Sequence, residues 1–224
     1  IDTESGKLVN SSEVILTARN LESIKLSAQE KDGVIWYSIS SNEDMVNFAK
    51  YVNMGATQIN GLLTTDLTLG NEFPMIGKLK TIKKEVSGYE DLLDFKLPTY
   101  AFVGMFDGQN HTITLNLDRN SQAVGFFGAA SSNAVIKNVV IDGNVKGEGK
   151  YTAGLVGCIV TQPGSGVEIT NCVNKAKVTG NYAAAGLVGA KVDPNMFHES
   201  FPNMELRIDN CANTGEVSAS KIAA

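Results

Sequence analysis

The chain has 224 residues, 43% of them hydrophobic and 19% charged, so it can bury a sizeable core without disulfides or metals. Lys plus Arg number 19 against 24 for Asp plus Glu, and a net charge of −5 argues against nucleic acid as a partner, because phosphate binding needs concentrated positive charge. Three cysteines exclude a disulfide scaffold, and no apolar run is long enough to span a bilayer.

The N-terminal part of the sequence is polar and begins at Ile1 with neither an initiating Met nor a signal peptide. We therefore expect a mature or trimmed chain from which any targeting segment or membrane anchor has been removed. Residues 1–34 contain two short apolar strings, at 14–16 and 24–26, which predict a lead-in with edge strands. The main domain is expected to cover residues 35–224.

A single helix is predicted at 41–53. Ser40 and Glu43 have the spacing of a capping box, and Gly55 is a plausible residue to end the helix. Between them, apolar residues recur at helical spacing and form one stripe: Met45, Phe48, Ala49 and Val52. This helix is interpreted as an α-helical cap on the domain.

The next segments favour strands with one interruption. Residues 62–69 predict a strand, while 78–101 joins a basic stretch to an acidic one and is interpreted as a surface insertion. A turn signal follows at 102–108, and alternating Ile113, Leu115 and Leu117 predict a half-buried strand.

Internal repeats then decide the fold class. A first motif, Gly-x-x-Gly, occurs three times, and each copy is followed by a second motif, Ile-x-Asn-Val/Cys, that starts at Ile136, Ile169 and Ile208. The repeated glycines are Gly125, Gly128, Gly154, Gly157, Gly186 and Gly189. These segments are too short, too rich in glycine and too β-branched for helix pairs, so we predict a mainly β fold of stacked coils, a right-handed parallel β-helix with coils over 125–219.

The spacing between motifs separates a constant part of each coil from a variable part. From the start of the Ile-x-Asn motif to the start of the following Gly-x-x-Gly motif, the distance is nearly constant, at 18 and then 17 residues. From the start of a Gly-x-x-Gly motif to the start of the Ile-x-Asn motif that follows it, the distance grows from 11 to 15 and then to 22 residues. All the growth therefore falls at one corner, where we expect any binding site. The next Gly-x-x-Gly motif would start at residue 225 or 226. We therefore also expect an open strand edge at the C-terminal end of the stack, where the protein either continues in nature or pairs.

Alignment of the coils predicts which side chains form ladders. Asn138, Asn171 and Asn210 occupy one aligned position, where stacked amides can hydrogen-bond along the stack. Two sets of side chains are expected to face the core: Val156, Cys158 and Val160 in one coil, and Val188, Ala190 and Val192 in the next. A third set is expected to point outward, one of each charge type and without a cluster: Lys137, Thr170 and Asp209.

The two motifs together resemble the GLUG-motif repeats of exported and surface proteins typical of Bacteroidetes. Residues 154–178 and 186–217 match well, and 125–145 departs from the pattern with Phe126-Phe127. Upstream, residues 106–113 are similar to the F-D-G-x-G-H-T-I element that precedes such repeats, except that Asn110 stands for a glycine. The resemblance covers roughly residues 35–219 and implies a right-handed β-helix that is secreted or attached to the outer surface, with no transferable catalytic residues and no cofactor.

Several candidate sites compete with structural interpretations. Asp107 and His111 suggest acid–base or metal chemistry, but Asp107-Gly108 is a turn dipeptide and two histidines in the chain exclude a multi-histidine metal site. Cys172 and Cys211 are aligned within disulfide reach, yet the equivalent Val139 favours a ladder of small buried residues.

The most suggestive segment for a ligand is the long corner loop 193–205. It carries Phe197, His198 and Phe201, which form either a candidate ligand loop or a cover folded back over the side of the domain. The favoured function is a non-catalytic, adhesin-like module that binds glycan or a surface protein through side loops. The alternative is a carbohydrate-active β-helix enzyme, a polysaccharide lyase or hydrolase.

Overall fold

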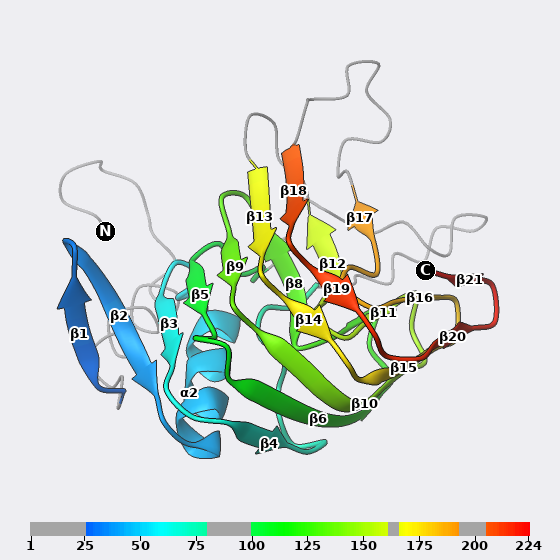
Figure 1. The fold of residues 1–224 in the computed structure, drawn as a ribbon, viewed down its shortest axis with the longest axis horizontal. Helices are drawn as coiled ribbons and strands as arrows, with labels where there is room; N and C mark the ends of the chain where they lie inside the picture. Colours follow the sequence, from blue (N-terminus) through cyan, green and yellow to red (C-terminus); the bar gives the residue numbers. More distant parts are fainter. Residues whose placement is uncertain (1–25, 80–99, 161–165, 193–204) are drawn as a thin grey trace, which may run out of the picture.

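The computed structural model describes residues 26–79, 100–160, 166–192 and 205–224, and these form a mainly β protein whose sheets are parallel (Figure 1). The named strands pair in parallel except at one edge, where β1 runs antiparallel to β2. No helix among these residues is both long and apolar enough to cross a membrane.

The strands lie in four sheets. Sheet 1 contains β1 (Ala28–Lys31), β2 (Val34–Ile39), β3 (Asn60–Leu63), β5 (Met105–Asp107), β9 (Val135–Lys137), β13 (Gly166–Thr170) and β18 (Glu205–Asp209). Sheet 2 contains β4 (Leu67–Leu69), β6 (Thr112–Arg119), β10 (Val140–Gly147), β14 (Val173–Asn174), β15 (Lys177–Gly180), β19 (Ala212–Asn213) and β20 (Val217–Ala219). Sheet 3 contains β7 (Ala123–Val124), β11 (Tyr151–Ala153), β16 (Ala183–Ala185) and β21 (Ile222–Ala223), and sheet 4 contains β8 (Phe127–Ser131), β12 (Val156–Val160) and β17 (Lys191–Val192).

From β5 onward the chain passes through sheets 1, 2, 3 and 4 in that order and then returns to sheet 1. We call one such passage a coil. Equivalent residues of successive coils are paired: Ile136 with Ile169, and Ile169 with Ile208. The register predicted for the second motif is therefore confirmed, and the fold is consistent with a β-helix-like stack of coils.

The predicted helix is confirmed as α2 (Asn42–Asn53), but its start lies one residue later than the capping-box interpretation. Ser41 is the N-cap and accepts a hydrogen bond from the Asp44 backbone N–H at 3.1 Å. Asp44 in turn accepts from the backbone N–H and the hydroxyl of Ser40 at 3.0 and 2.9 Å. The pair that closes this end is thus Ser41 and Asp44 rather than Ser40 and Glu43.

The helix ends at Asn53 with Met54 as its C-cap, and Gly55 takes the predicted position just after the cap. The Gly55 N–H donates to the carbonyl of Val52 and the Ala56 N–H to that of Tyr51, which is the Schellman pattern. Gly55 has a φ of +115°, a conformation that side chains with a Cβ rarely adopt.

The predicted single strand at 62–69 is wrong, because this segment turns a corner. β3 ends at Leu63 in sheet 1 and β4 begins at Leu67 in sheet 2. The Thr64 N–H donates to the carbonyl of Ile39, which anchors the corner. The apolar residues of 62–69 therefore belong to two strands, separated by the polar residues 64–66, that meet the same core from different sides.

The core near α2 is aromatic. Six phenylalanine rings pack together there, with the centroids of contacting rings 4.9 to 6.2 Å apart: Phe48, Phe73, Phe102, Phe106, Phe126 and Phe127. Most of the pairs are edge-to-face or tilted, and Phe73 is stacked on Phe126. Phe126-Phe127, which replaces Leu-Val in the first repeat, belongs to this aromatic cluster. The outer boundary of the predicted insertion also changes, because Ala101 is buried at 3% exposure. Residues 80–99 of that insertion, and the string at 14–16, lie outside the described residues.

The repeated glycines lie where neighbouring coils approach most closely. A Cβ on Gly157 would stand 2.7 Å from the backbone nitrogen of Val124, and one on Gly189 would stand 2.6 Å from the carbonyl oxygen of Gly157. Side chains of Asn174 and Asn213 occupy the corresponding space beside the first glycines of two motifs. Glycine is therefore needed for packing between coils rather than for backbone conformation at these positions.

The predicted inward face of the first motif is partly wrong. Val156 lies in the main core together with Ile159, whereas Cys158 and Val160 belong to a separate small cluster with Val192. All five residues of β12 are buried, so both faces of this strand are covered and the expected alternation of buried and exposed side chains is absent. The physical reason is that sheet 4 is covered on its second side, where Leu79, Tyr151 and Ala190 pack against this cluster.

Candidate functional site

The outward face of sheet 1 carries a row of polar side chains that come from successive coils. As predicted, Lys137, Thr170 and Asp209 stand side by side in register, and the row begins at Asp107. The Lys137 ammonium lies 3.5 Å from the carboxylate of Asp107, so the row contains an ion pair.

A second row lies two residues earlier on the same strands, and the sequence analysis missed it. Glu168 of β13 is paired in register with Arg207 of β18. Arg207 also forms an ion pair with Asp209 at 3.3 Å, and the Thr170 hydroxyl donates to Glu168 at 3.4 Å. The sequence analysis considered only Lys137, Thr170 and Asp209 on this face, and continuing the two-residue alternation back from Thr170 and Asp209 would have found the second row. We call these residues the polar face: Asp107, Lys137, Glu168, Thr170, Arg207 and Asp209.

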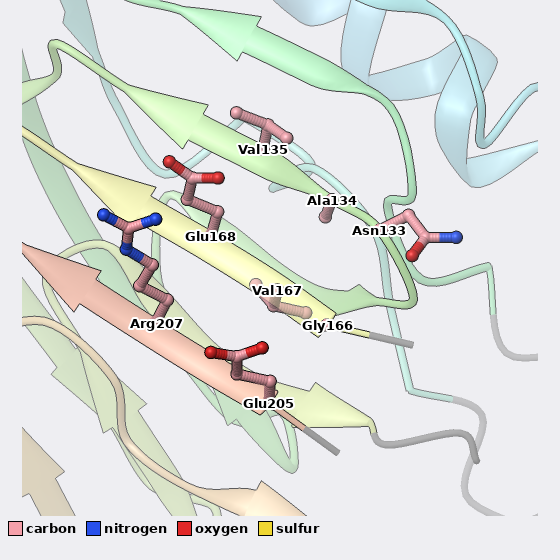
Figure 2. A pocket seen from close by; sticks show the side chains of 8 residues that line it. All are labelled: Asn133, Ala134, Val135, Gly166, Val167, Glu168, Glu205 and Arg207. Atoms are coloured by element: carbon pink, nitrogen blue, oxygen red, sulfur yellow. The ribbon is translucent and has the colours of Figure 1, made fainter. Parts of the chain in front are cut away.

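One end of the polar face opens into a hollow of about 320 Å³ where β13 and β18 begin (Figure 2). Glu168, Arg207 and Glu205 project from neighbouring strands along its rim, and Asn133 lies at the far side. Val135, Ala134, Val167 and Gly166 complete the lining. Carboxylates, a guanidinium and an amide beside an apolar floor give a surface that can pair hydroxyl groups and cover a nonpolar ring face.

The other end of the polar face is a ladder of amides, as predicted. Asn210 donates from Nδ2 to Oδ1 of Asn171 at 2.6 Å, Asn171 donates to Asn138 at 3.2 Å, and Asn138 donates to Asp107 at 2.9 Å. All the donors point the same way and the series ends on a carboxylate. We call this series the asparagine ladder.

The ladder residues share an unusual backbone conformation that the sequence analysis did not anticipate. Asn138, Asn171 and Asn210 have φ values of 56°, 53° and 50°. Asparagine tolerates this left-handed region better than other residues with a Cβ, so the same side chain both allows the turn and forms the ladder. Beside the ladder lies an open hollow of about 530 Å³, lined by Asn110, Asn138, Asn171, Val173, Asn210, Cys211 and Ala212.

The turn interpretation of Asp107 and His111 is confirmed. The Gln109 N–H donates to Asp107 at 3.0 Å, and His111 precedes β6. The partner of His111 is Asp66, whose carboxylate lies 3.0 Å from Nδ1 and also accepts from the Thr112 N–H at 2.9 Å. These contacts, first the Thr112 hydrogen bond and then that of His111, lower the pKa of Asp66.

The aligned cysteines are free thiols in a ladder, as favoured. Cys172 is buried and its backbone N–H donates to Sγ of Cys211 at 3.3 Å. Burial raises the pKa of Cys172 to about 12, and the same cause raises that of Cys158 to about 12. None of the described segments brings together three or more metal-ligating side chains.

The variable corner lies between sheet 4 and sheet 1. The chain leaves β8, β12 and β17 there and re-enters sheet 1 at β9, β13 and β18, so the longest connections return at the hollow beside Glu168 and Glu205. Phe197, His198 and Phe201 belong to the last of these connections and lie outside the described residues.

Comparison with known proteins gives one partial match. Over 105 residues, 46% of this chain, the sequence is 34% identical to Halomucin of Haloquadratum walsbyi. The chain spans about 1% of the length of that relative. No family model and no solved structure matches.

Proposed function

We propose that this chain is a right-handed parallel β-helix of the GLUG-repeat type, and that it serves as a non-catalytic, exported module which binds glycan on the polar face. The observation that carries the proposal is the polar face itself, which joins the hollow at Glu168, Glu205 and Arg207 to the asparagine ladder across four consecutive strands of sheet 1.

The chemistry of the polar face suits a sugar chain. Carboxylate, amide and guanidinium groups are the side chains that form paired hydrogen bonds with neighbouring hydroxyls. Most of its charges are already paired with each other, as in Asp107–Lys137 and Arg207–Asp209. A preorganised, nearly neutral surface loses little on binding and favours a neutral hydroxyl-bearing ligand over a strongly charged one.

The partial match supports a location at the cell surface. The relative is named Halomucin, and the matched region covers 46% of this chain. A repeat module on a surface protein has access to glycans and to other surface proteins, and the growing corner supplies loops beside the hollow.

A glycan array tests the proposal. The wild-type chain is expected to bind a set of neutral oligosaccharides, and Glu168→Gln and Arg207→Gln are each expected to weaken binding about tenfold, because each removes a charge-assisted hydrogen bond. Lys146→Gln is the matched control, since Lys146 pairs with Asp118 on sheet 2, away from the polar face. Binding that is absent, or unchanged in both variants, would contradict glycan recognition here; a pull-down with surface proteins would then test the protein-binding form.

A second candidate function rests on one observation: Glu168 and Glu205 line the same hollow as diagonal neighbours on adjacent parallel strands. Glycoside hydrolysis uses two carboxylates that flank the scissile bond, one as acid and one as base or nucleophile. Incubation with neutral and acidic polysaccharides would reveal new reducing ends or unsaturated products if the chain is an enzyme. Products that persist in a Glu168→Gln, Glu205→Gln double variant would exclude this pair.

A further inference from the structure

A second hollow, of about 250 Å³, lies at the corner between sheets 2 and 3 of the first coil, away from the polar face. It is formed where the connection that follows β4 passes the end of β6. Its lining is Pro74, Met75, Gly77, Lys78, Leu79, Arg119, Ser121, Gln122 and Ala123. Two of these residues are cationic and none is acidic.

The two cations have no carboxylate partner among the described parts of the chain. Arg119 donates from Nη2 to the carbonyl oxygen of Phe73 at 2.7 Å, a contact that fixes its guanidinium without neutralising it. Lys78 stands over the ring of Tyr100 at 5.9 Å from the centroid. The nearby carboxylate of Asp118, next to Arg119 in sequence, is instead paired with Lys146 at 2.9 Å. Within the described residues, no carboxylate therefore compensates the positive charge of this hollow.

Two residues that line the hollow each carry a buried polar atom with no partner among the described residues. Nε of Arg119 is a donor without an acceptor, and Oε1 of Gln122 is an acceptor without a donor. A buried donor or acceptor left unpaired costs free energy, and native structures leave few of them. A ligand that satisfies both atoms must supply an acceptor to Arg119 and a donor to Gln122.

We propose that this hollow binds one acidic sugar unit, a uronic acid. Its carboxylate would accept from Arg119, whose planar guanidinium suits the two carboxylate oxygens, with Lys78 nearby as a second positive charge. A ring hydroxyl would donate to Gln122. The volume is below the range typical of pockets for drug-sized ligands, which suits a single sugar rather than an oligosaccharide. This site differs from the polar face in place and in charge, so it stands whether or not the polar face binds glycan.

Titration of the whole chain with sodium glucuronate, followed by amide NMR shifts and calorimetry, tests the proposal. We expect saturable shifts at residues 119–123, weaker binding of sulfate, which carries no hydroxyl donor, and no binding of neutral glucose. Arg119→Gln is expected to reduce affinity about tenfold or more, and Arg119→Lys and Lys78→Gln are expected to reduce it less. Lys177→Gln, which removes a cation that is paired with Glu216 on sheet 2 outside this hollow, should leave the affinity unchanged.

Three results would overturn the proposal. Glucose binding as well as glucuronate would show that the charge has no role, and sulfate binding as well as glucuronate would make this a site for a bare oxyanion rather than a sugar. If Lys78→Gln bound glucuronate with unchanged affinity, glucuronate would not bind in this hollow. Lys78 is not a core residue, so this last variant keeps the test decisive even if the Arg119 variants fail to fold.

Discussion

At the scale of single residues, the asparagine ladder combines two requirements that substitutions can separate. Asn171→Gly keeps the left-handed backbone and loses only two side-chain hydrogen bonds, which contribute about 0.5–1.5 kcal/mol each. Asn171→Ala loses the same bonds and adds about 1–2 kcal/mol of backbone strain. Urea unfolding should therefore rank the variants wild type, Gly, Ala in order of decreasing stability. If the Asn171→Ala variant were as stable as Asn171→Gly, the left-handed backbone at position 171 would not be the source of the strain.

The three cysteines should differ sharply in reactivity. Burial raises the pKa of Cys158 and Cys172 to about 12, so that at pH 8 only about one thiol in ten thousand is ionised. Cys211 is half-exposed in the last coil. Alkylation of the folded protein followed by intact-mass measurement should show one rapid addition, at Cys211, and three additions after denaturation. Two thiols blocked before reduction would mean a Cys172–Cys211 disulfide and overturn this assignment.

At the scale of elements, the start of α2 predicts an acid-sensitive helix. Burial alone would raise the pKa of Asp44, but hydrogen bonds from Ser40 and Ser41 outweigh it and lower the pKa in the folded state. A carboxylate with a lowered folded pKa contributes stability above its unfolded pKa of about 3.9, and this contribution disappears as the pH falls through the folded pKa. Asp44→Asn should therefore lower the melting temperature at pH 7, and the difference should shrink below about pH 4.

Ser41→Ala provides the matched control for that experiment. Loss of the N-cap hydroxyl should cost about 1 kcal/mol, because the Asp44 N–H loses its acceptor. Ser41 does not titrate, so part of this loss should persist at acidic pH. An Asp44→Asn effect that stays constant from pH 7 to pH 3 would contradict the assigned role of the carboxylate.

Elements with a clear period could be predicted from the sequence, and elements that depend on long-range packing could not. The stripe at Met45, Phe48 and Val52 predicts α2 because one helix face meets the core. The run 62–69 is an exception, because the polar residues Thr64, Thr65 and Asp66 mark the break between β3 and β4 and could have been used to predict it. Cys158 could not be placed from local sequence, because its separate cluster depends on Leu79, Tyr151 and Ala190, which pack against that side of sheet 4.

The candidate sites follow the same division. The asparagine ladder could be predicted because equivalent positions repeat in sequence, and the repeats place them in register. The pairing of Glu168 with Arg207 depends on the same register and could have been found by following the alternation two residues further. The hollow at Lys78 and Arg119 could not be predicted, because it joins segments about 40 residues apart outside the repeats.

At the scale of the whole molecule, stacking concentrates variation in length at one corner. The connection from β12 to β13 is residues 161–165 and that from β17 to β18 is 193–204, while the strands on either side stay in register. Lengthening a connection from five to twelve residues costs only about 0.8 kcal/mol in loop-closure entropy. The turns of the asparagine ladder have no such freedom, because their side chains are hydrogen-bonded to those of neighbouring coils.

This asymmetry predicts where the chain accepts foreign sequence. A ten-residue Gly-Ser insertion between positions 162 and 163 should leave the melting temperature within a few degrees of wild type, whereas the same insertion between Asn171 and Cys172 should interrupt the asparagine ladder and unfold the adjoining coils. Circular dichroism melts would compare the two variants. Similar losses at both positions would contradict the distinction between corners.

The tolerant corner has a consequence for how such a protein can diversify. Its loops can change length and composition while the coils beneath them keep the same hydrogen bonds, so new recognition surfaces can be sampled without a matching loss of folding. For a protein engineer, the same property makes the stack a scaffold for displayed peptides. A library placed in the connections from β12 to β13 and from β17 to β18 would vary two segments that return to sheet 1 at the strands which line the hollow of Glu168 and Arg207.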